Sequence, residues 1–190
     1  GLGLWKIARD LAKQQVISSP LAMVVFATYS NQSKKMQSGI YKIEGKATIP
    51  QVVNKIAEGK VWKHKVTIPE GWAWWQIKDI LIAKKIIDNP SQFQNEARQN
   101  EGYLFPDTYD FLPGEPTDSI IKKIKDNFTK RTTGKQVTRE VVILASIVER
   151  EAKDDEDRPK IAGVYLNRLK KGMKLEADPT VQYAKGSWEP

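Results

Sequence analysis

The chain has 190 residues, of which 40% are hydrophobic, enough to bury a core in one domain or in two small ones. It contains no cysteine, which excludes disulfides and cysteine metal sites, and its single histidine, His64, argues against a zinc centre. The net charge of +8 permits an anionic partner, but the basic residues are dispersed in pairs and lack the arginine-rich runs of nucleic-acid-binding arms.

Residues 1–62 predict a small mixed unit of helices and one strand. Apolar residues at helical spacing predict helices over residues 4–16, 21–29 and 51–58. The last of these is capped by Thr48-Ile49-Pro50, and residues 39–43 alternate like a strand. The longest apolar run is too short to span a bilayer. This order of elements is compatible with a small α+β binding module.

Residues 63–100 predict a strand followed by two helices. Residues 63–68 alternate like a strand, and the turn after them leads into a helix that begins near Trp74. A second helix follows Asn89-Pro90. Trp72, Trp74 and Trp75 lie together at the start of the first helix. Packing explains such a cluster more simply than stacking on a sugar or a base does.

The segment from Glu101 to Tyr109 has little helical period and many aromatic and acidic side chains. We expect a shaped loop with a short strand. Tyrosine rings beside carboxylates suit a polar, uncharged ligand such as a glycan. The alternative is that the aromatic side chains fill the core, and the sequence leaves both interpretations open. Thr117 then begins another amphipathic helix.

Residues 138–153 predict one amphipathic helix with Thr138 at its N-cap. At about 100° per residue, Glu151 falls inside the apolar arc and Glu149 lies at the opposite edge of the same arc. A carboxyl group in such a place is buried or lines a cleft, and burial without a partner raises a carboxyl pKa, as a general acid requires. Two glutamates that end a helix are nevertheless more often a solvated, salt-bridged edge. The helix alone therefore leaves both interpretations open.

The last part of the chain predicts a helix and then a strand with a turn. Pro159 suits the first turn of a helix, with Ile161, Val164, Leu166 and Leu169 facing inward. Residues 173–180 predict a strand and a turn fixed by Pro179. The chain begins almost inside a helix and stops at residue 190 without a closing one, so we expect it to be a piece of a longer protein.

Three segments carry a family likeness: EGYLFPDTYDF (101–111), ASIVEREA (145–152) and AGVYLNRLKKGMKLEADPTVQYAKG (162–186). They resemble the endolytic murein transglycosylases known as the MltG or YceG-like family. The N-terminal segments GLWKIARDLAKQQVI, SGIYKI and VTIPEG are similar to the LysM-like subdomain of that family and its junction with the catalytic domain. The likeness covers nearly the whole chain.

The resemblance implies an α+β protein with a LysM-like module over residues 1–62 and a transglycosylase domain over 63–190, incomplete at its C-terminus. It implies a single-pass protein of the inner membrane whose catalytic part faces the periplasm or exterior, with the anchor outside this chain. Such enzymes use no cofactor or metal. They cleave nascent peptidoglycan strands between N-acetylmuramic acid and N-acetylglucosamine without water, leave 1,6-anhydro ends that limit strand length, and work beside cell-wall synthases.

The resemblance also implies residue roles. The second glutamate of the family motif is catalytic, which here is Glu151, in agreement with the helical periodicity. The groove residues implied for substrate binding are Glu101, Tyr103, Asp107, Tyr109, Asn167, Asp178, Thr180 and Tyr183. We expect Arg168 to brace one of the acids. Glu176 stands where the family more often has an amide, so it either perturbs the groove or faces solvent. Two later segments of the family site are absent from the sequence.

The alternative function is a peptidoglycan-binding or glycan-binding module without chemistry, which would use the tryptophans and the tyrosine-rich loop. A nucleic-acid binder is disfavoured, because it needs clustered positive charge.

Overall fold

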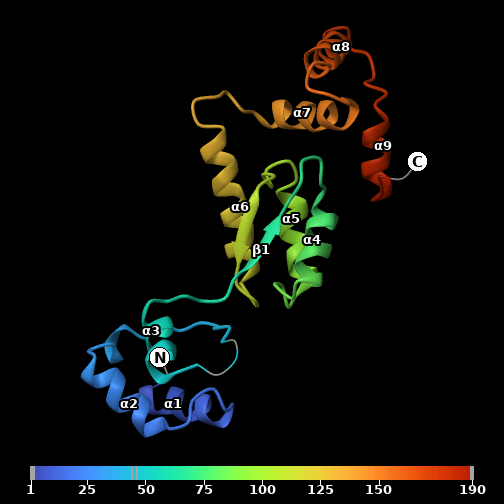
Figure 1. The fold of residues 1–190 in the computed structure, drawn as a ribbon. Helices are drawn as coiled ribbons and strands as arrows, with labels where there is room; N and C mark the ends of the chain where they lie inside the picture. The colour runs from blue at the N-terminus through green and yellow to red at the C-terminus, as the bar shows by residue number, and fades with distance from the viewer. Residues whose placement is uncertain (1–2, 44, 46, 189–190) are drawn as a thin grey trace. The chain divides into compact units, whose positions relative to one another are not determined.

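The structure is a computed structural model that describes residues 3–43, 45 and 47–188. It is α+β and mostly helical, and its described residues contain a single two-stranded sheet. The chain divides into two compact units, Gly1–Lys63 and His64–Pro190 (Figure 1). Each unit has a hydrophobic core of its own.

The N-terminal unit is built from helices α1 (Leu4–Lys13), α2 (Pro20–Tyr29), α3 (Ile49–Ala57) and the short 3-10 helix η1 (Ser33–Lys35). Local sequence explains where the helices start. Ser19 accepts the Ala22 N–H ahead of α2, and Thr48 forms a capping box with Gln51 ahead of α3. The core of the unit consists of Ala8, Ile17, Met23, Ala27, Val52, Val53 and Ile56.

The strand predicted over residues 39–43 is wrong. The Trp62 N–H does donate to the Ile40 carbonyl at 2.7 Å, but the described residues form no strand ladder there. The Lys55 ammonium donates to the carbonyl of Lys42, so a side chain takes an acceptor that a partner strand would need. Segment 39–43 therefore lies beside segment 61–63 as irregular extended chain.

The C-terminal unit contains the sheet, in which β1 (His64–Thr67) pairs antiparallel with β2 (Thr108–Phe111). Val66 pairs with Tyr109, and alternate residues of both strands are buried, as a half-buried sheet requires. Helices α4 (Trp74–Ala83), α5 (Pro90–Gln99) and α6 (Thr117–Arg131) share this core. The largest buried side chains there are Ile68, Ile77, Leu81, Ile86, Phe93, Phe111, Ile120 and Ile124.

Helices α7 (Arg139–Glu151), α8 (Arg158–Lys170) and α9 (Asp178–Lys185) complete the unit around a second, smaller cluster. Thr138 caps α7 by accepting the Val141 N–H. The cluster is formed by Ile147, Val148, Tyr165 and Ala177. Within this unit α7 lies across the ends of α4, α5 and α6, and α8 and α9 follow α7 in the chain (Figure 1).

Two details of the last segment differ from prediction. On α8, Val164, Leu166 and Leu169 are exposed, and the buried residue is Tyr165. The predicted strand over residues 173–180 is also wrong, because the chain is irregular until Asp178 starts α9. Pro179 lies in the first turn of this helix, where its missing N–H is not needed, so it starts a helix instead of fixing a turn.

The three clustered tryptophans pack against other side chains of the C-terminal unit, as predicted. Trp72 and Trp74 are partly buried against the core of the C-terminal unit, and Trp75 contacts other aromatic rings.

Candidate active site

Glu151 ends α7, and its carboxylate is held by a residue of α8. The Tyr165 hydroxyl donates to Glu151 Oε1 at 3.0 Å. Burial raises the pKa of Tyr165 first, and the bonded Glu151 and the more distant Asp178 raise it further. Asp178 is the first residue of α9, so the end of α7, the middle of α8 and the start of α9 meet at this point.

The position of Glu151 follows from the packing of α7. Ile147 lies one turn before Glu151 on the same side of the helix and packs with Tyr165 and Ala177. Glu151 is therefore drawn toward α8, yet it is only half-buried because it lies at the helix end. The carboxylate is thus both anchored and open to a ligand.

Glu149 faces a different part of the unit. Burial raises the pKa of Glu149, and the nearby Glu70 carboxylate raises it further, while Arg158, the Gly71 N–H and Arg150 oppose the shift. Arg158 also lies 3.5 Å from Glu70. The Glu149 side chain thus lies against the turn before α4, whereas the Glu151 side chain lies against α8.

Glu101 lies at the start of α4, where its Oε2 accepts the Trp74 N–H at 3.1 Å. Burial raises the pKa of Glu101 to about 7, and this backbone hydrogen bond only partly offsets the shift. The Tyr183 pKa is raised by burial and then by the nearby Glu101, which places α9 beside this carboxylate. The Glu101 segment also touches α7, since a Cβ at Gly102 would lie 2.6 Å from Val142 Cγ1.

Glu101 should make stability depend on pH between about 4.5 and about 7. A carboxyl group whose pKa is raised in the folded state binds its proton more tightly there than in the unfolded chain. The folded state therefore loses stability as pH rises through this window, by about 2 to 3 kcal/mol, and the loss levels off above it.

A Glu101→Gln variant keeps an acceptor for the Trp74 N–H but does not titrate. Urea unfolding at several pH values should show the variant gaining stability relative to wild type from pH about 4.5 to about 7. Glu156→Gln, an exposed residue of the α7–α8 turn, serves as control. Parallel pH profiles for wild type and Glu101→Gln would contradict the prediction.

An aromatic cluster lies between α4, α9 and the C-terminal segment. Trp75 lies 5.3 Å from Tyr183 and 5.4 Å from Trp188, measured between ring centroids. The Trp188 indole N–H donates to Gln76 at 2.7 Å, and the Arg150 guanidinium lies 4.2 Å from the Trp188 ring. Of the residues in this cluster, the sequence identifies only Tyr183 as a site residue and misses Trp188 and Arg150; it also misses Tyr165, the partner of Glu151.

Three of the predicted groove residues anchor the 101–109 loop to α6. The Tyr103 ring meets Phe128 edge-on at 5.1 Å. The buried Tyr109 donates its hydroxyl hydrogen to the Phe105 carbonyl and accepts from Asn127. Asp107 accepts from Asn127, the Thr108 N–H and Arg131, which together hold the Asp107 pKa below its usual value. The contacts of these residues hold the loop in place.

The remaining predicted residues lie on α8 and around the start of α9. Asn167 is exposed, and the Thr180 hydroxyl donates to the Ala177 carbonyl. Arg168 pairs with an acid outside the predicted groove set: its guanidinium lies 3.3 Å from Glu176 and donates to the Leu175 carbonyl. Glu176 itself faces solvent, with 71% of its side chain exposed.

The described part of the chain contains no group of three or more His, Cys, Asp or Glu side chains that could hold a metal ion. Nor does any helix in residues 3–43, 45 and 47–188 combine the length and apolar character needed to cross a membrane.

Comparison with known proteins places these residues in a family context. The model of the YceG-like family matches residues 1–190. A Bacillus subtilis protein named endolytic murein transglycosylase is 30% identical over 222 residues, covering 98% of this chain and 61% of its own length. A Streptococcus pneumoniae protein of the same name is 25% identical over 232 residues, covering 98% of this chain and 42% of its own length.

A solved structure of a similar protein also matches the chain. The crystal structure of a yceG-like protein from Listeria monocytogenes matches 100% of this chain and 74% of that chain, with a TM-score of 0.55 and 26% identity. The chain therefore spans about three-fifths of the Bacillus subtilis relative and about two-fifths of the Streptococcus pneumoniae one.

Proposed function

The chain belongs to the YceG-like family, and on that premise we propose that the native protein is an endolytic peptidoglycan lytic transglycosylase. It cleaves the β-1,4 bond between N-acetylmuramic acid and N-acetylglucosamine in nascent glycan strands. It leaves 1,6-anhydro ends and so limits strand length. The names of the Bacillus subtilis and Streptococcus pneumoniae relatives support this activity.

Glu151 is the residue to which the chemistry is assigned. As the acid, it donates its proton to the glycosidic oxygen while the bond from that oxygen to C1 breaks. As the resulting carboxylate, it accepts the proton of the C6 hydroxyl while that oxygen bonds to C1 and closes the anhydro ring. No water is added, so no second carboxylate is needed to activate one.

The observation that carries the proposal is the hydrogen bond from Tyr165 to Glu151 Oε1. It fixes the orientation of the carboxyl group and leaves Oε2 as the oxygen that meets the substrate. Asp178, which lies near enough to influence Tyr165, belongs to the proposed substrate groove. Glu101 and Tyr183, which lie together, extend this groove, and Asn167 and Thr180 line its exposed edge.

Tyr103, Asp107 and Tyr109 have a more indirect place in the groove. Their side chains are engaged by α6, so they act on substrate by shaping the loop that begins at Glu101.

The domain roles belong to the same proposal. Residues 1–62 form a LysM-like module and residues 63–190 contribute to the transglycosylase domain, and the division of the chain after Lys63 supports this assignment. The protein acts on peptidoglycan strands outside the cytoplasmic membrane, beside cell-wall synthases, and is held there by a membrane anchor.

A glycan-binding module without chemistry is the second candidate. The cluster of Trp75, Tyr183 and Trp188 favours it, because aromatic faces bind sugar rings whether or not a bond is cut.

Purified peptidoglycan separates the two candidates. We expect the native protein to sediment with the polymer and also to release soluble glycan fragments over time. Sedimentation without release would favour the binding module, and release without a requirement for Glu151 would reject the assigned acid.

A further inference from the structure

The net positive charge of the protein comes almost entirely from its N-terminal unit. Residues 1–63 contain ten lysine and arginine residues against three acidic ones, a net charge of +7. Residues 64–190 contain 21 basic and 20 acidic residues, a net charge of +1. Almost the whole excess of +8 therefore lies in one third of the chain, which favours an anionic ligand for this unit.

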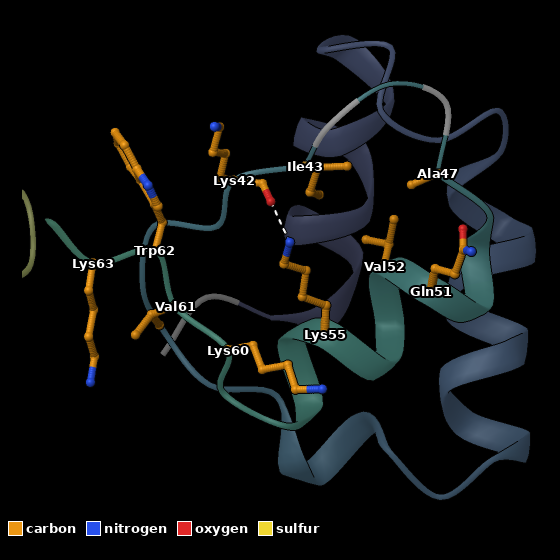
Figure 2. Close-up of a pocket in the computed structure, with 10 residues that line it drawn as sticks. All are labelled: Lys42, Ile43, Ala47, Gln51, Val52, Lys55, Lys60, Val61, Trp62 and Lys63. Atoms are coloured by element: carbon orange, nitrogen blue, oxygen red, sulfur yellow. Dashed lines mark hydrogen bonds between the residues drawn. The ribbon is translucent and has the colours of Figure 1, made fainter. Parts of the chain in front are cut away.

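The N-terminal unit also contains a cavity of about 610 Å³, a volume typical of small-ligand sites. Residues of α3 form one wall, and Lys42, Ile43 and Ala47 together with residues 60–63 form the other (Figure 2). The Trp62 N–H donates to the Ile40 carbonyl, so the chain just before Lys42 lies beside Trp62. The residues lining the cavity are Lys42, Ile43, Ala47, Gln51, Val52, Lys55, Lys60, Val61, Trp62 and Lys63.

The charged residues of this lining are all lysines. Lys55 extends from α3 to the Lys42 carbonyl, whereas Lys60 and Lys63 lie on the other segment (Figure 2). Lys60 is paired with Glu58 at 2.5 Å, and both side chains are more than half exposed, so water screens that pair. Four lysines thus line this cavity, and Ile43, Val52 and Val61 contribute apolar side chains to the same lining.

We propose that this cavity binds a phosphate-bearing ligand, specifically a sugar or polyol chain linked by phosphodiesters. The ammonium group of lysine binds phosphate as a point charge, and four lysines line this cavity. The apolar walls accommodate the uncharged carbon skeleton between phosphates.

Single-stranded nucleic acid fits the same cavity less well. Such binders combine positive charge with several aromatic platforms for successive bases. Trp62 is the one aromatic residue among those lining the cavity. This inference concerns the N-terminal unit and does not depend on the assignment of Glu151 as a catalytic acid.

Titration calorimetry of the whole chain with a short glycerol phosphate oligomer tests the proposal. We expect saturable binding that weakens as salt is added, because the contacts are between charges. Lys60→Gln combined with Lys63→Gln should weaken binding about 10-fold. The matched control is Lys34→Gln with Lys35→Gln, which removes two exposed charges from the same unit outside the cavity and should change affinity less than about 2-fold.

Three outcomes would overturn the proposal. One is the absence of binding at low salt. A second is equal weakening by both lysine pairs, which would indicate attraction to net charge without a site. The third is tighter binding of single-stranded DNA, or of phosphatidylglycerol vesicles, with the same dependence on Lys60 and Lys63, since it would assign the cavity to a nucleic acid or to a membrane.

Discussion

Replacing Glu151 by glutamine is expected to abolish glycan cleavage by the native protein, with a loss of about a thousand-fold in rate. Glutamine has nearly the same shape and can still accept the Tyr165 hydroxyl hydrogen bond, but it can neither donate the acid proton nor take one back. Because Glu151 is half-buried at a helix end, the fold should be retained. Release of soluble fragments from peptidoglycan measures the rate, and circular dichroism with thermal unfolding checks the fold.

Glu149→Gln is the matched control, two residues away on the same helix. Its carboxylate faces Gly71 and Glu70, so its loss should leave cleavage within a few-fold of wild type. The assignment is reversed if Glu149→Gln eliminates cleavage and Glu151→Gln does not. Full activity in both variants would remove this helix end from the chemistry.

The second large effect is expected at Gly102, where an alanine should lower the free energy of unfolding by about 3 kcal/mol. Its φ of +84° lies in the left-handed region, which an alanine adopts only with strain. In addition, its Cβ would lie 2.6 Å from Val142 Cγ1 on α7, so that the loop or the helix must move. Urea unfolding measures the loss.

Gly134→Ala separates the two causes. Gly134 has a similar φ of +79°, but a Cβ there would meet nothing within 4 Å, so its substitution should cost only about 1 kcal/mol. Adding Val142→Ala to Gly102→Ala should recover part of the contact cost, which appears as coupling in a double-mutant cycle. Equal losses at Gly102 and Gly134 would show that the loop does not press on α7.

The helices were predictable because their signals are local. Capping at Ser19, Thr48 and Thr138 and the apolar spacing of each helix depend on neighbours in sequence. The strand predicted over residues 39–43 failed because a distant group, Lys55, takes the Lys42 carbonyl. The error at Pro179 is local, since proline suits both a turn and the first turn of a helix, and here it begins a helix.

The site was predictable only in part, for the same reason. Periodicity alone placed Glu151 toward the apolar side of its helix. Its partner Tyr165 lies on the next helix, and a tyrosine four residues after Ile161 was the only signal that could have indicated it. Glu101 is buried by the fold and accepts the N–H of Trp74, which is 27 residues away, so no local pattern reveals its raised pKa.

The mass of the cleavage products tests the central claim most directly. If Glu151 serves in turn as acid and as base for an internal ring closure, each new N-acetylmuramic acid end is an anhydro sugar. It is then lighter by one water molecule than the corresponding reducing end. Mass spectrometry of fragments released by the native protein should show these anhydro ends, and digestion in isotopically labelled water should leave them unlabelled. Reducing ends that carry the labelled oxygen would show hydrolysis and contradict the account.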